Sequence, residues 1–403
     1  MRARRDVVPV WKDEYMSDPA DAGTNPSDQP TASDMAADEA NPTADELADV
    51  EHERNALRAF VESLGFAELK NGQWFPRLLA ASMSAYAKKV DAKYFQDKYH
   101  GVPPDVIVDQ RIKMAARYAA IEGGLSASAY TGVIVATIGS LGGASPATVP
   151  AAVATVMVDI AYISQLQLQL AYDIAVLYRV PLDVDDPDDL WKLIKVAFTI
   201  KSGELAREGA IKAVPALVRP LIKKFYSGAV LNAAKGLPVV GKFLLQRNLI
   251  KIGIPLVGIP LAVILNRWTT AAAGKHARAV FRNEARVLEA TERLLDRSRH
   301  PQLLLWVAWL VVQADGKTSD DEALLLRHLT RLVQERHDIA DDRLASIVDL
   351  DPDDVWSLVA EADDDLADVV DASEAVAKID GEINAKERAV LEELSAHCSE
   401  EAA

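Results

Sequence analysis

The chain has 403 residues, of which 50% are hydrophobic, and carries a formal net charge of -16. This length is enough for about two or three domains, and the hydrophobic share excludes a chain that is disordered throughout. Cys398 is the only cysteine, which excludes an intrachain disulfide and a cysteine-based zinc site and is compatible with a reducing cytoplasm.

The charge divides the chain into three regions. Residues 1–50 carry 4 basic and 12 acidic side chains, residues 51–300 carry 32 and 22, and residues 301–403 carry 8 and 26. The net charges are therefore -8, +10 and -18. We expect an acidic N-terminal region, a basic middle and an acidic C-terminal region with different partners.

The first 45 residues are rich in Asp, Ala, Pro, Ser and Thr and show no hydrophobic period. This composition predicts a disordered acidic tail over residues 1–45. The start MRARRD is followed by VVPVW, which is too short for the apolar core of an export signal, so we expect a cytoplasmic protein. From about Glu46 apolar residues recur at three- and four-residue steps, for example at Leu57 and Phe60, which predicts helices.

A charge-free stretch rich in Gly, Ala, Ser and Val lies between Glu122 and Asp159. Its centre, GSLGGASP, breaks helices, so the stretch predicts two short apolar helices joined by a turn. Each arm has about 16 to 18 residues, fewer than the ~20 that a membrane span needs. Two interpretations stand: a small-residue hairpin buried inside a helical domain, or a hairpin inserted into or against a bilayer.

A long helix is predicted next, from about Ala147 to Tyr178. Asp159 and Asp173 are fourteen residues apart, close to four helical turns, so they lie near one stripe of this helix. Buried carboxylates need partners. We therefore expect both to pair with Lys or Arg of the middle region, or to lie at a domain edge, rather than to act in catalysis.

A strongly basic segment follows and runs into a second charge-free stretch, Ile252 to Asn266. Basic helices beside short apolar ones suit an anionic membrane surface, although an ordinary solvated helix face is the alternative interpretation. Aromatic residues are sparse and no nucleic-acid-binding motif is present, so we expect no nucleic-acid partner. The candidate residues for the anionic surface are Lys201, Arg207, Lys212, Arg219, Lys223, Lys224, Lys235, Lys242, Arg247 and Lys251.

The run from Pro146 through Leu190, with the preceding VIVATIGSLGG and the later basic and apolar segments, resembles the EcsC family. The resemblance covers about residues 50–290 and rests on a diffuse pattern rather than on a short motif. It implies a helical protein without established enzymatic activity that is linked to membrane and transport processes.

The C-terminal region contains an internal repeat. LWVAWLVVQADGKTSDDEALLLRHL (305–329) aligns with VDASEAVAKIDGEINAKERAVLEEL (370–394) at a constant offset of 65 residues, without gaps. In each copy an apolar helix leads into Asp-Gly, a short loop follows, and a second helix begins just before a glutamate. The matched pairs are Val311 with Val376, Asp315 with Asp380, Gly316 with Gly381, Glu322 with Glu387, Leu326 with Leu391, and Leu329 with Leu394.

Helix capping explains most of this repeat. Ser319 with Glu322, and Asn384 with Glu387, have the spacing of a capping box, in which the glutamate accepts a hydrogen bond from the N-cap amide. The glycine of each Asp-Gly pair is typical of a helix C-terminus, where it permits a left-handed turn. Capping alone therefore accounts for the glutamates and the glycines.

The repeated aspartate is not explained by capping. Asp315 and Asp380 each follow a helix, where a negative charge meets the negative end of the helix dipole. Each loop resembles the second half of a calcium-binding EF-hand loop but lacks carboxylates at the first and third positions, so it cannot complete such a site alone. Packed as a symmetric pair, the loops would pool four carboxylates around one divalent cation, with calcium as the first choice. Capping alone and a cation site both remain open here.

AWLVVQADGKTSDDEALLLRHL and EAVAKIDGEINAKERAVLEEL resemble the two signature segments of the TerB-like family, named for tellurite resistance. The resemblance covers about residues 300–398 and implies an all-helical domain whose acidic residues bind divalent cations. The second copy departs by Ile379 for Ala and Asn384 for Ser, and Lys378 is expected to weaken cation binding there. The ligands that the resemblance implies are Asp315, Glu322, Asp380 and Glu387.

Between the two copies lies the acidic stretch DLDPDDVWSLVAEADDDLADVVD. Such a run is typical of solvated helix ends, and it also predicts intramolecular docking of the acidic C-terminal module on the basic residues 201–251.

Together these patterns predict an all-α protein with a disordered acidic tail (1–45), an EcsC-like basic and apolar domain (46–299), a TerB-like acidic domain (300–398) and a short tail (399–403). We expect a non-enzymatic, stress- or transport-associated protein at the inner face of the membrane, which it contacts through anionic lipid or a membrane-protein partner. The alternative is a soluble protein-interaction scaffold without metal. An enzyme ranks third, because there is no nucleophile elbow, phosphate loop or His-based metal motif and the 7 His are scattered.

Overall fold

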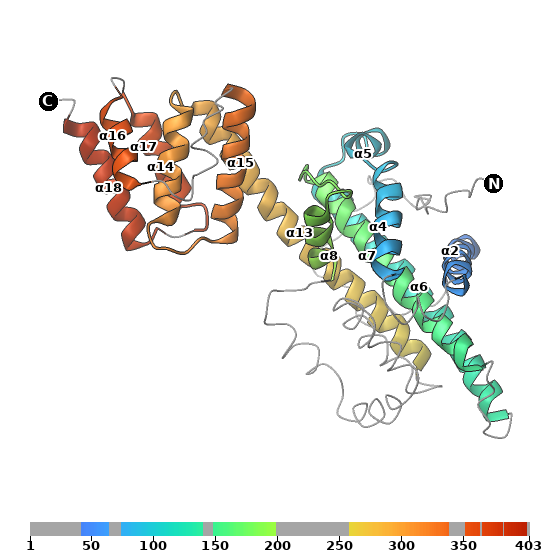
Figure 1. Cartoon of the computed structure of the whole chain (residues 1–403). Helices are drawn as coiled ribbons and strands as arrows, with labels where there is room; N and C mark the ends of the chain where they lie inside the picture. The colour runs from blue at the N-terminus through green and yellow to red at the C-terminus, as the bar shows by residue number, and fades with distance from the viewer. Residues whose placement is uncertain are drawn as a thin grey trace, which may run out of the picture. The chain divides into compact units, whose positions relative to one another are not determined.

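The computed structural model describes residues 42–63, 74–139, 148–198, 258–337, 351–362, 365–381 and 383–400. Within these ranges all regular structure is α-helical, in twelve helices and no strand (Figure 1), which confirms the predicted all-α class. The chain divides into two compact units, Met1–Val280 and Phe281–Ala403. The division falls inside helix α13 (Gly258–Arg297). The sequence analysis predicted the domain boundary further along the chain, between residues 299 and 300, just after α13 ends.

The first unit is built around α7. A stretch of this helix, residues 157–175, is buried at every position, as expected of a helix surrounded by others. Helices α2, α4, α5, α6 and α8 all pack against it. The bounds are α2 Ala44–Glu62, α4 Trp74–Ala87, α5 Ala92–Lys98, α6 Pro104–Gly139, α7 Thr148–Leu177 and α8 Pro187–Ala197.

Helices α6 and α7 form the predicted hairpin around the glycine-rich breaker. They pack against each other, and the predicted long helix, Ala147 to Tyr178, matches α7 to within one residue at each end. The arms are longer than the apolar stretches alone, at 36 and 30 residues. Among the helices that the structure describes, none has the length and hydropathy of a membrane span. The structure does not describe the side chains of residues 129–156, around the tip of the hairpin.

Both aspartates of α7 pair with arginines, as predicted. Asp173, which is 1% exposed, accepts a hydrogen bond of 2.9 Å from Nε of Arg111 and one of 2.8 Å from the hydroxyl of Tyr86. Burial disfavours the charged guanidinium, but the carboxylate of Asp173 outweighs it and raises the pKa of Arg111. Asp159 accepts a hydrogen bond from Ser126 and lies 3.7 Å from Nη2 of Arg54. These carboxylates therefore have structural partners.

The second unit is built around α14. Nine of its 13 residues are buried, and α15, α16, α17 and α18 pack against it. The repeat corresponds to two helix pairs, α14 with α15 and α17 with α18, and α14 and α17 are in direct contact. The bounds are α14 Pro301–Gln313, α15 Asp320–His337, α16 Pro352–Ala360, α17 Ala367–Ala377 and α18 Ala385–Glu400.

Candidate functional site

The two Asp-Gly loops join α14 to α15 and α17 to α18. Gly316 and Gly381 have φ angles of 74° and 114°, in the left-handed region that glycine alone adopts without strain. A Cβ added to either glycine would meet nothing within 4 Å, so the requirement is conformational rather than steric. The prediction of left-handed glycines after each helix is confirmed.

Both capping boxes are present. The amide of Ser319 donates to Oε2 of Glu322 over 2.6 Å, and the amide of Glu322 donates to Oγ of Ser319 over 3.2 Å. In the second copy the amide of Asn384 donates to Oε2 of Glu387 over 2.9 Å, and the amide of Glu387 donates to Oδ1 of Asn384 over 3.0 Å. Each glutamate is 5% exposed. The caps therefore hold two buried carboxylates at the start of α15 and of α18.

The aspartate of the first loop has a local role that the sequence analysis missed. Oδ1 of Asp315 accepts a hydrogen bond of 2.7 Å from the amide of Lys317, which closes an Asx-turn over Gly316. An Asp-Gly pair after a helix was the signal for such a turn. In the second copy the equivalent amide belongs to Glu382, outside the described residues, and Asp380 itself is exposed.

The two loops meet through Asn384. Its Nδ2 lies 3.4 Å from Oδ2 of Asp315 in the other copy, 69 residues away in sequence, and it also donates to Oε1 of Glu387. One side-chain amide therefore bridges a carboxylate of each copy. The second copy can do this because it has asparagine where the first has Ser319.

Glu387 has an environment that disfavours its charged form. Its pKa is raised, first by burial and then by the negative charges of Glu322, Asp380 and Asp315, against the lowering effect of its hydrogen bond from the Asn384 amide. The contacts across the repeat join two of the four predicted residues, Asp315 and Glu387, through the side-chain amide of Asn384.

Carboxylate oxygens are the donors that calcium and magnesium prefer, so the residue types fit a hard divalent cation. In the part of the chain that the structure describes, however, no group of three or more His, Cys, Asp or Glu has the arrangement of a metal site. Both glutamates accept cap hydrogen bonds through Oε2, so a bound cation would share these carboxylates with the helix starts that they stabilise.

Lys378 pairs within its own part of the chain. Its Nζ lies 3.0 Å from Oε2 of Glu374, one turn back on α17. An i,i+4 pair of opposite charges is a common helix-surface arrangement. The weakening of cation binding by Lys378 stays a prediction.

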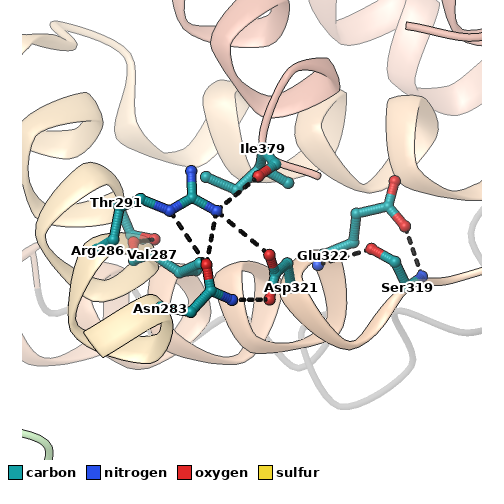
Figure 2. A network of polar contacts seen from close by, with 8 residues as sticks. All are labelled: Asn283, Arg286, Val287, Thr291, Ser319, Asp321, Glu322 and Ile379. Atoms are coloured by element: carbon teal, nitrogen blue, oxygen red, sulfur yellow. Dashed lines mark hydrogen bonds and ion pairs between the residues drawn. The ribbon is translucent and has the colours of Figure 1, made fainter. Parts of the chain in front are cut away.

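A polar network from α13 reaches both copies (Figure 2). Asn283 donates to Oδ1 of Asp321 over 2.7 Å, and Nη2 of Arg286 lies 3.3 Å from Oδ2 of the same carboxylate. The same Nη2 donates to the carbonyl of Ile379 over 3.1 Å, at the end of α17. Arg286 therefore supplies a positive charge beside the helix end that precedes Asp380, where the sequence analysis considered a bound cation.

The ten basic residues proposed for an anionic surface, Lys201 to Lys251, lie outside the described residues, as do the first 41 residues of the predicted acidic tail. The predicted docking of the acidic module on this basic segment likewise involves residues that are not described.

No protein-family model, no curated protein and no solved structure matches this chain. The resemblances to the EcsC and TerB-like families therefore stay predictions that rest on the residues quoted for them.

Proposed function

We propose that the C-terminal module binds one divalent cation, calcium as the first choice, with Asp315, Glu322, Asp380 and Glu387 as ligands. The observation that carries this proposal is the contact between Nδ2 of Asn384 and Oδ2 of Asp315, which joins the loops of the two copies. Neither loop has enough oxygen ligands alone, and six or more are needed for calcium. Pooling the loops removes that objection, with water and backbone carbonyls completing the set.

Electrostatics supports a cation at this place. Burial, and then the negative charges of Glu322, Asp380 and Asp315, raise the pKa of Glu387, and a divalent cation would offset the repulsion among these charges. The Nδ2 group of Asn384, the positive end of an amide dipole, already lies between carboxylates of the two copies. A cation would take over this bridging role with a larger charge.

We further propose that the chain is a non-enzymatic, stress- or transport-associated protein that acts at the cytoplasmic face of the membrane. The basic segment 201–251 and the apolar stretch after it support contact with anionic lipid. In this proposal the cation-binding module gives a membrane-peripheral protein its sensitivity to divalent ions.

A soluble interaction scaffold without metal is the second candidate. The capping boxes give Glu322 and Glu387 a role without an ion, and the Asx-turn does so for Asp315. Arg286 supplies a positive charge at the carbonyl of Ile379, the residue before Asp380. The two candidates differ in one measurable property, which is cation affinity.

Calorimetric titration of the chelator-treated full chain with calcium chloride, and separately with magnesium chloride, tests the cation proposal. We expect saturable binding that the double variant Asp315→Asn/Asp380→Asn weakens at least about tenfold, or ~1.4 kcal/mol. Asparagine keeps the oxygen that accepts the turn hydrogen bond, so the loops should stay folded. Asp371→Asn, on an exposed position of α17, is the matched control and should bind as the unchanged protein does. Absence of binding, or equal binding by the double variant, would favour the scaffold.

Vesicle flotation tests the membrane proposal. The full chain should float with vesicles containing phosphatidylserine and be released at high salt, because screening weakens exposed charge attraction. Charge reversal at Lys223 and Lys224 should reduce flotation, whereas reversal at Lys88 and Lys89, an exposed pair outside the basic segment, should not. Equal flotation with neutral phosphatidylcholine vesicles would contradict the electrostatic mechanism.

A further inference from the structure

We propose that Ile264 and Trp268, on the outward face of α13, form an apolar anchor that inserts into the interface of an anionic lipid bilayer. The inference rests on the proposed membrane contact and deepens it, because it assigns part of that contact to two described side chains outside the basic segment 201–251. Its basis is the hydrophobic pattern of residues 258–280, which is the reverse of the pattern expected for a surface helix in water.

The face of α13 that packs into the first unit is small and polar. Its residues recur at three- and four-residue steps and are at most 3% exposed: Ala262, Asn266, Thr270, Ala273 and Ala277. Nδ2 of Asn266 donates to Oε2 of the buried Glu122 over 2.8 Å, and Nε2 of Gln167 on α7 donates to the hydroxyl of Thr270 over 3.1 Å. Hydrogen bonds and small side chains therefore make up the inner side of this helix.

The backbones of α6 and α13 approach each other closely on this inner side. A Cβ added to Gly123 would lie 2.7 Å from the carbonyl oxygen of Ala262 and 2.9 Å from Nδ2 of Asn266. Neither position can therefore hold a large apolar side chain without moving the two helices apart.

The large apolar side chains of this part of α13 point the other way. Ile264 and Trp268 each follow a buried residue, Ala262 and Asn266, by two positions, which is a rotation of about 200° around the helix. They are 57% and 62% exposed and lie one turn apart, so they share one stripe. A helix with hydrogen bonds on its inner face and exposed Ile and Trp on its outer face fits an apolar environment outside the unit.

Charge indicates that this environment is the surface of an anionic bilayer. Residues 258–283 contain no acidic residue and four basic ones: Arg267, Lys275, Arg278 and Arg282. Lys275 is exposed on the same stripe, two turns after Trp268, where its long side chain can reach a lipid phosphate. Tryptophan favours the bilayer interface, because its ring is apolar and its N–H needs a polar partner.

Flotation of the full chain with vesicles of phosphatidylserine and phosphatidylcholine tests the anchor. Burial of one large apolar side chain in lipid contributes roughly tenfold to partitioning, so Ile264→Ser/Trp268→Ser should lower the partition coefficient by about tenfold or more. Trp191→Ser is the matched control, since Trp191 is 47% exposed but lies on α8, whose first turn carries Asp188 and Asp189. It should partition as the unchanged protein does.

A second measurement keeps both anchor residues in place. In a Cys398→Ser background, Ala271→Cys places an environment-sensitive fluorophore on the outer stripe between Trp268 and Lys275. Its emission should shift to the blue when the vesicles are added, and a quencher attached to the lipid chains should reduce it. The same fluorophore at Gln110→Cys, an exposed position of α6, should show neither effect.

The outcomes separate this inference from the proposed function. If the unchanged chain does not float, the proposed membrane contact fails and the anchor falls with it. If the chain floats and the double variant floats equally, the membrane contact stands and the anchor is overturned. An unchanged emission at residue 271 would also overturn it. So would a dimer that the double variant converts to a monomer in sedimentation without a change in flotation, because a second copy of the chain would then cover the stripe.

Discussion

The buried pair between Arg111 and Asp173 makes the sharpest stability prediction. Replacing Arg111 by methionine keeps most of the side-chain volume but removes one of the two hydrogen-bonding partners of Asp173, leaving the hydroxyl of Tyr86. Hydrogen bonds to charged groups contribute about 1.5–3 kcal/mol each, and two from Arg111 to Asp173 would be lost. This agrees with the ~3–5 kcal/mol typical of breaking a buried ion pair, since the two residues are only 3% and 1% exposed.

Two further variants isolate the cause. Arg111→Met/Asp173→Leu removes both charges and should recover much of the lost free energy of unfolding, because no unpaired charge remains. Arg278→Met removes an arginine of the same unit whose partners Asp105 and Asp109 are solvent-accessible, and it should cost at most about 1 kcal/mol. The loss in Arg111→Met should also shrink as pH falls, because burial raises the pKa of Asp173 and protonation removes its unpaired charge.

Hydrogen exchange with peptide resolution is the appropriate assay, because a chain with two compact units need not unfold in one transition. Protection should fall along α6 and α7 in Arg111→Met, and peptides from residues 300–400 provide the internal reference. The reasoning is refuted if Arg111→Met reduces protection no more than Arg278→Met does, or if the double variant is less protected than the single one.

Three further predictions concern the second unit. Calcium affinity, measured by titration between pH 5 and pH 7, should fall as pH falls. The fall should begin at a pH above the usual pKa of a glutamate, because the raised pKa of Glu387 lets protons compete with calcium at higher pH. A pH-independent affinity would exclude Glu387 as a ligand. Gly316→Ala should lower the free energy of unfolding by about 1–2 kcal/mol in urea titrations, since its φ of 74° is strained for alanine although there is space for the methyl group, and Gly316→Asn should cost less. Leu329→Ala, at a side chain that is 0% exposed, should cost about 2–5 kcal/mol in the same titration; a loss below 1 kcal/mol would contradict the burial of Leu329.

Local patterns were enough to predict much of the fold. The bounds of α7 follow from an apolar run between a glycine-rich breaker and a polar loop, and the caps at Ser319 and Asn384 follow from the spacing to a glutamate three residues later. These features depend on residues within one or two helical turns, so the sequence states them directly. The ion pair between Lys378 and Glu374 could have been predicted in the same way, because Glu374 lies four residues before Lys378.

Contacts between distant segments could not be predicted in the same way. The contact of Asn384 with Asp315 spans 69 residues and that of Arg286 with Ile379 spans 93, and neither residue belongs to a motif that names its partner. The sequence suggested that the two loops form a pair, because a repeat implies related structures. It did not indicate that a third element, α13, bonds to both.

The capping role of Glu322 and Glu387 affects how this motif should be interpreted in other proteins. A related chain would keep both glutamates whether or not it binds ions, because losing either would leave the amide of the N-cap residue without its carboxylate partner. Their presence in a distant sequence is therefore poor evidence of ion binding. Asp315 and Asp380 take no part in the capping boxes, so this pair of aspartates is the more informative comparison.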